Sequence, residues 1–426
     1  MPKKIQSLSG MHDIFNSRYD YFEKIREVSS RVAKEYGFKG IEFPIMEETE
    51  LFARGVGGVT DIVEKEMYTF KTKGGDFVAL RPEGTASVMR AYIEHNFYTR
   101  PQPTKLFYFG PFFRYERPQA GRFRQFWQFG LEAIGKSCFV VDVQIIKVIS
   151  NIFEELGIKT KIEVNNMGDL KCRKEFKTVL RRYLKKRSNL LCSDCKRRLK
   201  ENPLRVLDCK QCIEVKSEAP QIIDHICKQC RSDFKNFLEF LEELDIPYNL
   251  NPFLVRGLDY YTGTVYEFFL ETEDEERMAV GGGGRYDGLS KILGDEERPA
   301  TGVAIGIERI ILAMEKSGGD IIEKKIPDVF IAQLGDLAKK KALNLFEEMR
   351  NSKVDVAESF GQDSLKSQMN RADKLGAKIT IIIGKEEAVE DRVILRDMNS
   401  GEQEKIKTEE VLKEVKGRLK KNKNKD

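Results

Sequence analysis

Histidine is scarce in this chain, which has three among 426 residues: His12, His95 and His225. None lies near a Gly-x-Ser-x-Gly turn, and no His-Glu-x-x-His sequence occurs, so a Ser-His-Asp hydrolase or a zinc protease has little support. The chain also lacks the roughly 18–20 uncharged apolar residues of a membrane-spanning helix. Residues 1–6 show no apolar stretch of a secretory signal. We therefore expect a cytoplasmic protein without a membrane segment.

The net charge is small, at +5, but the charge is unevenly distributed. Residues 171–200 contain thirteen Lys or Arg and two acidic residues, a local net charge of +11. Residues 413–426 add seven basic and two acidic residues. Such clusters attract phosphate backbones through Coulomb forces and counterion release. An isolated basic run is more often a solvated helix face, so charge alone leaves nucleic-acid binding open.

Six of the eight cysteines form three Cys-x-x-Cys pairs: Cys192/Cys195, Cys209/Cys212 and Cys227/Cys230. Thiols stay reduced in the cytoplasm, so paired cysteines indicate metal ligands before disulfides. The first two pairs have zinc-ribbon spacing, and four thiolates satisfy one tetrahedral Zn²⁺. The sequence therefore predicts a structural zinc site, with reduced free thiols as the alternative, and does not decide which pairs bind.

Residues 1–325 read as one α+β domain, because their strands and helices do not alternate regularly. The pattern predicts a mixed or antiparallel sheet. A helical, basic and Cys-rich insertion interrupts this domain at residues 167–249. We expect the sheet to resume with a strand at residues 253–256.

A polar, Gly-rich linker is predicted at residues 317–327. Beyond it, residues 326–419 alternate as βαβαβ followed by a hairpin and a final helix. That alternation predicts a small, largely parallel α/β domain. Residues 420–426 are expected to form a disordered basic tail.

The densest group of charged residues lies between two aromatic strands, where four arginines and one glutamate fall within residues 114–124. Alternate strand residues share a face, so Arg114 and Glu116 are expected to point the same way. A guanidinium group suits phosphate oxygens because it binds them in a bidentate manner. A surface ion-pair loop is the alternative, but it leaves the apolar flanking strands unexplained.

Four further segments carry candidate site residues. The glycine run 281–284 allows a ligand to approach the backbone closely, although it is not the Gly-x-Gly-x-x-Gly of a dinucleotide site. Arg309 lies one turn into an apolar helix. Residues 80–85 and 254–263 place charged groups beside Pro or Gly turns at strand ends. Each segment alone is also compatible with an ordinary loop or helix.

Together, these five ordered segments resemble the histidyl-tRNA synthetases, a family of class II aminoacyl-tRNA synthetases. Arg114 with Glu116 resembles the second class II motif, and residues 306–309 resemble the third. The helix and strand that end at Pro44 resemble the first motif, which forms the dimer interface. Residues 256–261 and 283–288 resemble the two signatures of the histidine enzyme. The resemblance covers residues 9–410, and the class I His-Ile-Gly-His and Lys-Met-Ser-Lys-Ser sequences are absent.

The resemblance implies a histidine–tRNA ligase of the protein-biosynthesis machinery. Such an enzyme converts L-histidine and ATP, with Mg²⁺, to histidyl-adenylate and transfers the histidyl group to the 3′ end of tRNA(His). The implied fold is a class II antiparallel sheet core with a helical insertion that contacts the acceptor arm. A C-terminal anticodon-binding domain and a homodimer are also implied. The family does not require a zinc ion.

The resemblance also implies residue roles. Arg114 and Arg256 would hold the α-phosphate as the catalytic cations. The implied ATP-binding residues are Arg114, Glu116, Arg309, Gly282, Gly283, Gly284 and Arg285. The implied histidine-binding residues are Glu83, Gly84, Thr85, Arg114, Gln128, Glu132, Arg256, Tyr260 and Tyr261. Trp127 stands where the family usually has histidine, and by strand parity it should face away from Gln128, which predicts altered packing with catalysis retained.

Two alternatives remain. A non-catalytic paralogue that regulates histidine biosynthesis shares this core, but typically lacks the 256–261 signature and the C-terminal domain, both present here. A tRNA-binding module without adenylation is supported only by the basic insertion and tail. Histidine-dependent ATP–pyrophosphate exchange distinguishes these functions.

Overall fold

The computed structural model describes residues 4–58, 60–271, 278–317 and 326–423. Two compact units, Met1–Ile322 and Glu323–Asp426, make up the chain. Most of the predicted linker, residues 318–325, lies outside the described residues. Within the described ranges, no helix has the length and apolar character needed to cross a membrane.

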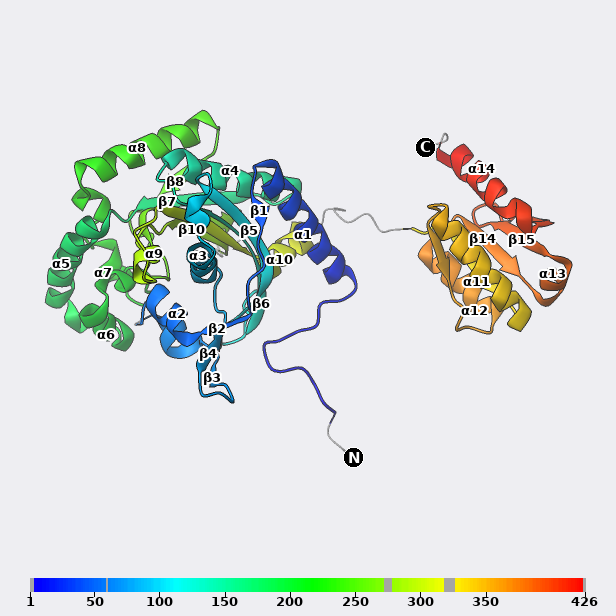
Figure 1. The fold of residues 1–426 in the computed structure, drawn as a ribbon, viewed down its shortest axis with the longest axis horizontal. Coiled ribbons are helices and arrows are strands. Elements are labelled where there is room, and N and C mark those ends of the chain that lie inside the picture. Colours follow the sequence, from blue (N-terminus) through cyan, green and yellow to red (C-terminus); the bar gives the residue numbers. More distant parts are fainter. Residues whose placement is uncertain (1–3, 59, 272–277, 318–325, 424–426) are drawn as a thin grey trace. The chain divides into compact units, whose positions relative to one another are not determined.

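The larger unit is built on an eight-stranded sheet in the order β1-β5-β6-β11-β10-β9-β7-β8 (Figure 1). Neighbouring strands are antiparallel except for β1 with β5 and β7 with β8. The predicted α+β class is confirmed. The strands are β1 (Lys39–Gly40), β5 (Thr104–Phe113), β6 (Gln125–Ile134), β7 (Thr160–Asn166), β8 (Tyr248–Leu250), β9 (Thr262–Leu270), β10 (Ala279–Arg285) and β11 (Ala300–Gly306).

Apolar helices and strands form one continuous core with this sheet. Helix α1 buries Phe22, Ile25, Val28 and Val32 at helical spacing, and these residues pack in one cluster with Ile149 of α4. Each such buried side chain contributes roughly 1.5–3 kcal/mol relative to an exposed one. The helices that share this core are α1 (Ser17–Glu35), α4 (Phe139–Glu155), α8 (Lys228–Glu243) and α10 (Ile307–Ser317).

A second core joins helix α3 to the insertion. The basic helix α5 is amphipathic: Phe176, Leu180 and Leu184 are fully buried along one stripe. Most of its charged residues occupy the opposite side, although Arg173 is buried, and the apolar stripe anchors the insertion to the sheet unit. The helices here are α3 (Thr85–Glu94), α5 (Leu170–Lys186), α6 (Ser193–Glu201) and α7 (Ile213–Ser217).

The sheet resumes earlier than predicted. Strand β8 pairs in parallel with β7 inside the interval assigned to the insertion, through Ile162 and Tyr248. The predicted strand at residues 253–256 is wrong, because this segment is a loop. The Asn165 amide holds the segment by donating hydrogen bonds to the carbonyls of Pro252, at 3.2 Å, and Leu254, at 2.9 Å. A side chain thus provides contacts that the sequence pattern attributed to a strand.

A three-stranded sheet and two short helices complete the larger unit. Strand β4 pairs antiparallel with both β2 and β3. This small sheet leads directly into α3 and so positions the segment that carries Glu83. The elements are β2 (Met46–Glu48), α2 (Thr49–Gly55), β3 (Thr69–Lys71), β4 (Phe77–Leu80) and α9 (Leu289–Ile292).

The smaller unit contains a five-stranded sheet in the order β13-β12-β14-β15-β16. The first three strands are parallel, and β14, β15 and β16 pair antiparallel, so the predicted parallel α/β pattern ends in the predicted hairpin. The strands are β12 (Val329–Gln333), β13 (Val356–Glu358), β14 (Ile379–Ile383), β15 (Arg392–Asp397) and β16 (Gln403–Lys407). The helices are α11 (Asp336–Asn351), α12 (Leu365–Leu375), α13 (Lys385–Glu390) and α14 (Val411–Lys423).

The predicted disordered tail at residues 420–426 is corrected in part, because α14 continues to Lys423. Lysine is a good helix former, and no glycine or proline follows Leu419 to end the helix. Residues 424–426 lie outside the described residues.

Candidate active site

A cavity of about 370 Å³ brings together residues from all five candidate segments. Strands β6, β9, β10 and β11 contribute to its lining, as do the start of α10 and the loops that precede α3 and follow β5. Residues separated by more than two hundred positions therefore share one space. The predicted site residues that line it are Glu83, Gly84, Thr85, Arg114, Glu116, Gln128, Arg256, Tyr260, Tyr261, Gly282 and Arg309.

Arg114 lies just beyond the end of β5, and three contacts hold its guanidinium group. Its Nε donates to the carbonyl of Pro82 at 2.9 Å, its Nη1 lies 3.8 Å from Glu116, and its guanidinium carbon lies 5.2 Å from the ring centroid of Phe126. Glu116 also pairs with Arg122, at 3.6 Å. The group is fixed in place while its remaining N–H donors stay available to an anion.

Arg256 comes from the loop that was predicted to be a strand. Its Nη1 pairs with Glu267 of β9 at 2.9 Å, and within the described part of the chain its buried Nε has no hydrogen-bond partner. Burial lowers its pKa, but Glu267 and the neighbouring Tyr261 raise it more, so the net shift is upward and the group stays charged. Glu267 was not predicted as a site residue, because a glutamate in an aromatic strand carries no distinctive sequence signal.

Arg309 completes the set of three guanidinium groups. Its Nε donates to the carbonyl of Gly121 at 3.2 Å, and its Nη1 donates to the carbonyl of Ala279. Burial lowers its pKa from the usual value, and Arg122 acts in the same direction. Arg114, Arg256 and Arg309 thus line one cavity, as a shared triphosphate site requires.

A group of buried carboxyl and hydroxyl groups forms the other part of the site. Glu83 is 3% exposed and accepts hydrogen bonds from the amides of Thr85, at 2.7 Å, and Ala86, at 2.9 Å. The Tyr260 hydroxyl donates to it at 3.3 Å. Burial raises the pKa of Glu83, while these amide donors oppose the shift. The N-terminus of α3 therefore fixes a carboxylate at the edge of the cavity.

Glu132, predicted to bind histidine, is 1% exposed and is not among the residues that line the cavity, but it contacts Thr85, which is. The Thr85 hydroxyl donates to it at 2.7 Å, and the Tyr286 hydroxyl donates to its other oxygen. Burial raises its pKa to about 8. The sequence placed Tyr286 in the 283–288 signature without giving it a role. In the structure its hydroxyl contacts Glu132.

The hydroxyl of Tyr108 is buried and has no hydrogen-bond partner among the described residues. Its ring fills the space above two glycines: a β-carbon on Gly84 would lie 2.4 Å from this ring, and one on Gly130 would lie 2.2 Å from it. Tyr108 lines the cavity. It was missed because a tyrosine in an aromatic strand is typical of a core.

Three residues predicted to bind ATP do not line the cavity. Arg285 pairs with the buried Asp142 at 3.1 Å and with Asp287 at 2.8 Å, so its charge is used in a structural ion pair. Gly283 and Gly284 face neighbouring strands, where a β-carbon would lie 2.1 Å from the Gly302 carbonyl or 2.5 Å from the Thr264 carbonyl. The position of these three residues supports sheet packing and gives no support to the nucleotide role.

Trp127 packs on the face of β6 away from the cavity. Its ring lies 4.9 Å from that of Phe22 and 5.7 Å from that of Phe109, whereas Gln128 lines the cavity. Strand parity predicted this division.

The backbone amide of Trp127 donates to Glu308 at 2.8 Å, and burial raises the pKa of Glu308 to about 7.

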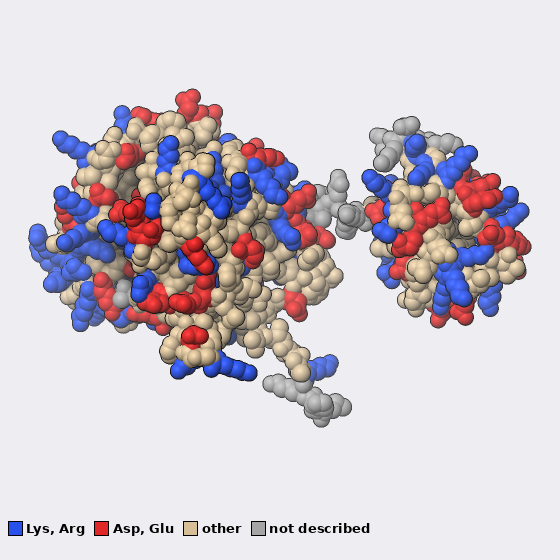
Figure 2. Space-filling model, viewed as in Figure 1, with Lys and Arg blue, Asp and Glu red and all other residues tan. Residues whose placement is uncertain are grey.

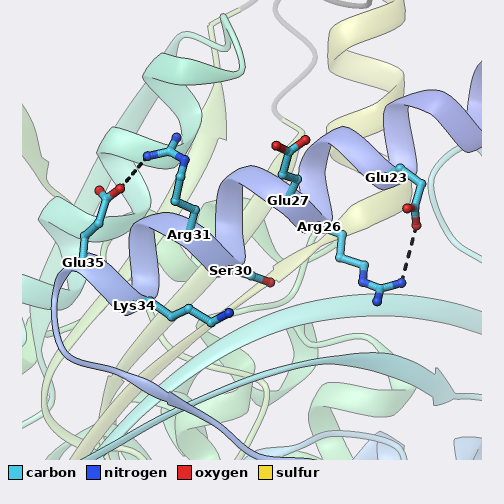
Figure 3. A pocket seen from close by; sticks show the side chains of 7 residues that line it. All are labelled: Glu23, Arg26, Glu27, Ser30, Arg31, Lys34 and Glu35. Carbon is cyan, nitrogen blue, oxygen red and sulfur yellow. Dashed lines mark hydrogen bonds and ion pairs between the residues drawn. The ribbon is translucent and has the colours of Figure 1, made fainter. Parts of the chain in front are cut away.

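A second hollow runs along the exposed side of α1 (Figure 3). Its charged side chains pair along the helix, Arg26 with Glu23 at 3.5 Å and Arg31 with Glu35 at 2.7 Å. Solvent-exposed pairs of this kind contribute about 0–1 kcal/mol each. The hollow is therefore a solvated helix face and has no convergent buried groups.

The cysteines form two clusters in the insertion. Cys192, Cys195, Cys209 and Cys212 place their sulfur atoms within 4.8 Å of one another. The third pair joins a different group: Cys227 and Cys230 lie with Cys172 and Asp169. The sequence did not indicate this second group, because Cys172 is far from the pairs along the chain.

Comparisons with known proteins agree with this geometry. The Histidyl-tRNA synthetase family profile matches residues 10–310, and an anticodon-binding domain profile matches residues 328–418. A histidine–tRNA ligase of Halothermothrix orenii is 44% identical over 96% of this chain and 99% of its own length. A histidine–tRNA ligase of Thermodesulfovibrio yellowstonii is 44% identical over 96% of this chain and 97% of its own length. The apo histidyl-tRNA synthetase of S. aureus is 36% identical, covers 97% of this chain and 100% of its own, and superimposes with a TM-score of 0.80. The chain belongs to the histidyl-tRNA synthetase family.

Proposed function

We propose that this chain activates L-histidine with ATP and transfers the histidyl group to the 3′ end of tRNA(His). One observation carries the proposal: three arginines from distant segments line the cavity that also contains Glu83. Cations fixed at one end and buried carboxyl and hydroxyl groups at the other suit a triphosphate beside a small polar amino acid. A cytoplasmic location accords with these substrates.

Arg114 and Arg256 are the proposed catalytic cations. The histidine carboxylate attacks the α-phosphate in line, the bond from the α-phosphorus to the bridging oxygen breaks, and pyrophosphate leaves while negative charge accumulates on the phosphate oxygens. Fixed guanidinium groups stabilise that charge without reorganising, which is the main need of phosphoryl and adenylyl transfer. The pairing of Arg256 with Glu267, at 2.9 Å, orients the group before ATP arrives.

The other proposed nucleotide contacts are those that the family resemblance implies, and their residues line the cavity. Arg309 holds the γ-phosphate, Glu116 contacts the adenine amino group, and Gly282 lets the nucleotide lie against the backbone. Mg²⁺ binds oxygen ligands and usually combines one or two carboxylates with substrate phosphates. Glu267 is a carboxylate that lines the cavity and would hold that ion together with the phosphates.

Histidine is recognised at the carboxyl-rich end. Glu83 receives the α-amino group, Gln128 lies near the carboxylate, and Glu132 with Tyr261 hydrogen-bonds the imidazole nitrogens. Thr85 and Tyr286 fix the orientation of the Glu132 carboxyl. An amino acid that lacks one ring nitrogen leaves a buried polar group unpaired, which rejects it strongly.

The insertion and the smaller unit are the proposed tRNA-binding parts. Lysine and arginine side chains gather over α5 and α6 (Figure 2). Between these helices a hollow is lined by Arg181, Lys185, Lys196 and Lys200. A clustered set of flexible cations binds an RNA backbone through counterion release. We assign the acceptor arm to this surface and the anticodon to residues 326–419.

A homodimer is proposed through the segment that resembles the first class II motif and the small sheet that follows Pro44. Four large apolar side chains remain exposed on β2, β3, β4 and the residue before β2: Ile45 (44%), Met46 (54%), Phe70 (44%) and Phe77 (67%). Apolar residues gathered on one small sheet typically mark a protein interface. Sedimentation of the intact chain tests this: a monomer at micromolar concentration contradicts the proposal.

The four-cysteine cluster is the proposed structural zinc site. The Sγ atoms of Cys192 and Cys209 are 3.9 Å apart, close to the ~3.8 Å separation of two thiolates on a tetrahedral Zn²⁺. The amide of Cys192 donates to the sulfur of Cys212 at 3.4 Å, as the hydrogen bonds that orient zinc ligands do. The donor set thus fits this ion.

Histidine-dependent exchange of pyrophosphate into ATP tests the activity. Exchange with histidine, followed by charging of tRNA(His), is the expected result. Binding of tRNA without exchange would favour the non-catalytic module, and the absence of both would favour the regulatory paralogue. Arg256→Ala is expected to abolish exchange while tRNA binding persists. Exchange that survives this change overturns the role of Arg256.

A further inference from the structure

Four potential metal ligands meet where the insertion leaves and rejoins the sheet unit. Asp169 and Cys172 lie at the N-terminus of α5, and Cys227 and Cys230 lie at the N-terminus of α8. Their nearest ligand atoms all lie within 4.8 Å of one another. We call this group the neck cluster. It combines Asp169 and Cys172 with the third Cys-x-x-Cys pair, which is not part of the four-cysteine cluster.

The backbone around the neck cluster directs N–H groups at its sulfur atoms. The amide of Cys227 donates to the sulfur of Cys172 at 3.1 Å, and the amide of Cys230 donates to the sulfur of Cys227 at 3.5 Å. Amide donors and helix N-termini both stabilise thiolates, the form in which cysteine binds metals. Two long helices, α5 and α8, present their N-termini here.

Asp169 directs one oxygen at the α5 backbone and the other at a cysteine of the cluster. Its Oδ1 accepts the amide hydrogen of Cys172 at 2.7 Å and so caps α5. Its Oδ2 lies 3.9 Å from the sulfur of Cys227. Because Zn–S and Zn–O bonds are about 2.3 and 2.0–2.2 Å, two ligands of a tetrahedral zinc lie about 3.5–3.8 Å apart. The neck cluster is therefore slightly wider than a closed zinc site, and small side-chain rotations close it.

We propose that the neck cluster binds a second structural Zn²⁺ through Asp169, Cys172, Cys227 and Cys230. All four positions of the metal are then filled by protein ligands, which is typical of a structural site rather than a catalytic one. The ion joins the first turn of α5 to the first turn of α8. The proposal does not depend on the aminoacylation activity.

The location gives the ion a structural consequence. One turn beyond Asp169, Arg173 of α5 donates to the carbonyls of Tyr261, at 2.6 Å, and Asp259, at 3.2 Å. That loop carries the proposed imidazole-binding residue Tyr261. A metal at the neck thus fixes the helix start that supports this loop.

Metal analysis of the purified full-length chain tests the proposal. We expect two zinc ions per chain, one ion in a Cys227→Ser/Cys230→Ser variant and one ion in a Cys195→Ser/Cys212→Ser variant. Cys138→Ala is the matched control and retains two, because Cys138 belongs to neither cluster. After reloading with Co²⁺, the thiolate-to-metal absorption lost with the neck pair should be that of a three-thiolate site.

Asp169→Asn separates a metal ligand from a helix cap. Asparagine keeps a side-chain oxygen for the Cys172 amide and is an equally good N-cap, but loses the carboxylate. We expect faster loss of one zinc to a chelator, with unchanged far-ultraviolet circular dichroism. Metal retention equal to that of the unsubstituted chain overturns the aspartate ligand.

Two results overturn the neck site itself. One is a zinc content that the Cys227→Ser/Cys230→Ser variant leaves unchanged. The other is a disulfide among Cys172, Cys227 and Cys230 in protein purified without oxidant. The first result includes a single zinc that disappears only in the Cys195→Ser/Cys212→Ser variant, which leaves the four-cysteine site standing. None of these results bears on histidine-dependent exchange, so the two proposals fail separately.

Discussion

A β-carbon on Gly282 would lie 2.5 Å from Nη1 of Arg256. The glycine therefore leaves the space in which the guanidinium group reaches Glu267, at 2.9 Å. Of the glycines in the run at 281–284, this one faces the proposed catalytic arginine. This steric role is additional to the nucleotide contact proposed for Gly282.

Gly282→Ala is expected to displace Arg256 and lower histidine-dependent pyrophosphate exchange by about 10²-fold or more, the usual effect of losing one fixed transition-state donor. Gly361→Ala is the control, because a β-carbon there meets no atom within 4 Å. Equal exchange by the two variants would contradict the steric role.

Glu132 should make stability depend on pH. Its folded-state pKa is raised from 4.5 to about 8 by burial, so the folded chain holds a proton that the unfolded chain releases. This contribution is fully present below about pH 4.5 and is lost as the pH rises through about 8. Its size is on the order of a few kcal/mol.

Urea unfolding between about pH 5 and 9 measures the effect. The fall in unfolding free energy with rising pH should be smaller for Glu132→Gln than for the unsubstituted chain. Glu94→Gln, at an exposed helix position, should leave the profile unchanged. A pH profile that Glu132→Gln does not alter would show that this carboxyl ionises normally.

The basic hollow between α5 and α6 should govern tRNA affinity. In Lys185→Gln/Lys196→Gln, each lost phosphate contact should weaken binding and make the plot of log affinity against log salt shallower by about 1. Filter binding of tRNA(His) at several salt concentrations measures this. Lys235→Gln, on the exposed side of α8, is the control, and an unchanged salt slope in the double variant would remove the hollow from the interface.

Trp127 should contribute to stability more than to catalysis. Trp127→Ala removes the contacts with Phe22 and Phe109 and should lower the unfolding free energy by up to about 3 kcal/mol. Exchange at 25 °C should remain within severalfold of normal, because Gln128 faces the cavity independently. Thermal unfolding and exchange rates measure the two effects, and a large loss of exchange in a stable variant would reverse this assignment.

The sequence predicted the cavity better than it predicted individual contacts. The resemblance of the ordered motifs to one family implied that Arg114, Arg256 and Arg309 share a site, and all three line the cavity. The ion pair of Arg285 with Asp142 was not predicted, because a signature identifies a residue without indicating its partner, and the buried Asp142 lies 143 positions away. Glu267 and Tyr108 were not predicted to line the cavity for a similar reason, because glutamate and tyrosine are ordinary in an aromatic strand.

Long-range pairing also explains the other differences. The segment at 253–256 has strand-like composition. However, the Asn165 amide donates hydrogen bonds to the carbonyl of Leu254 and to that of Pro252 just before the segment. Cys172 was isolated along the chain and yet lies beside Cys227 in space. In each case the deciding contact joins residues about 55 or more positions apart, which local patterns do not encode.

The parallel pairing of β7 with β8 has a wider consequence. About eighty residues of chain depart from one strand and return to the strand beside it, with Ile162 opposite Tyr248. An insertion whose two ends lie on neighbouring strands can change in length with little strain on the sheet that carries it. The pairing of β7 with β8 therefore does not depend on the length of the chain inserted between them.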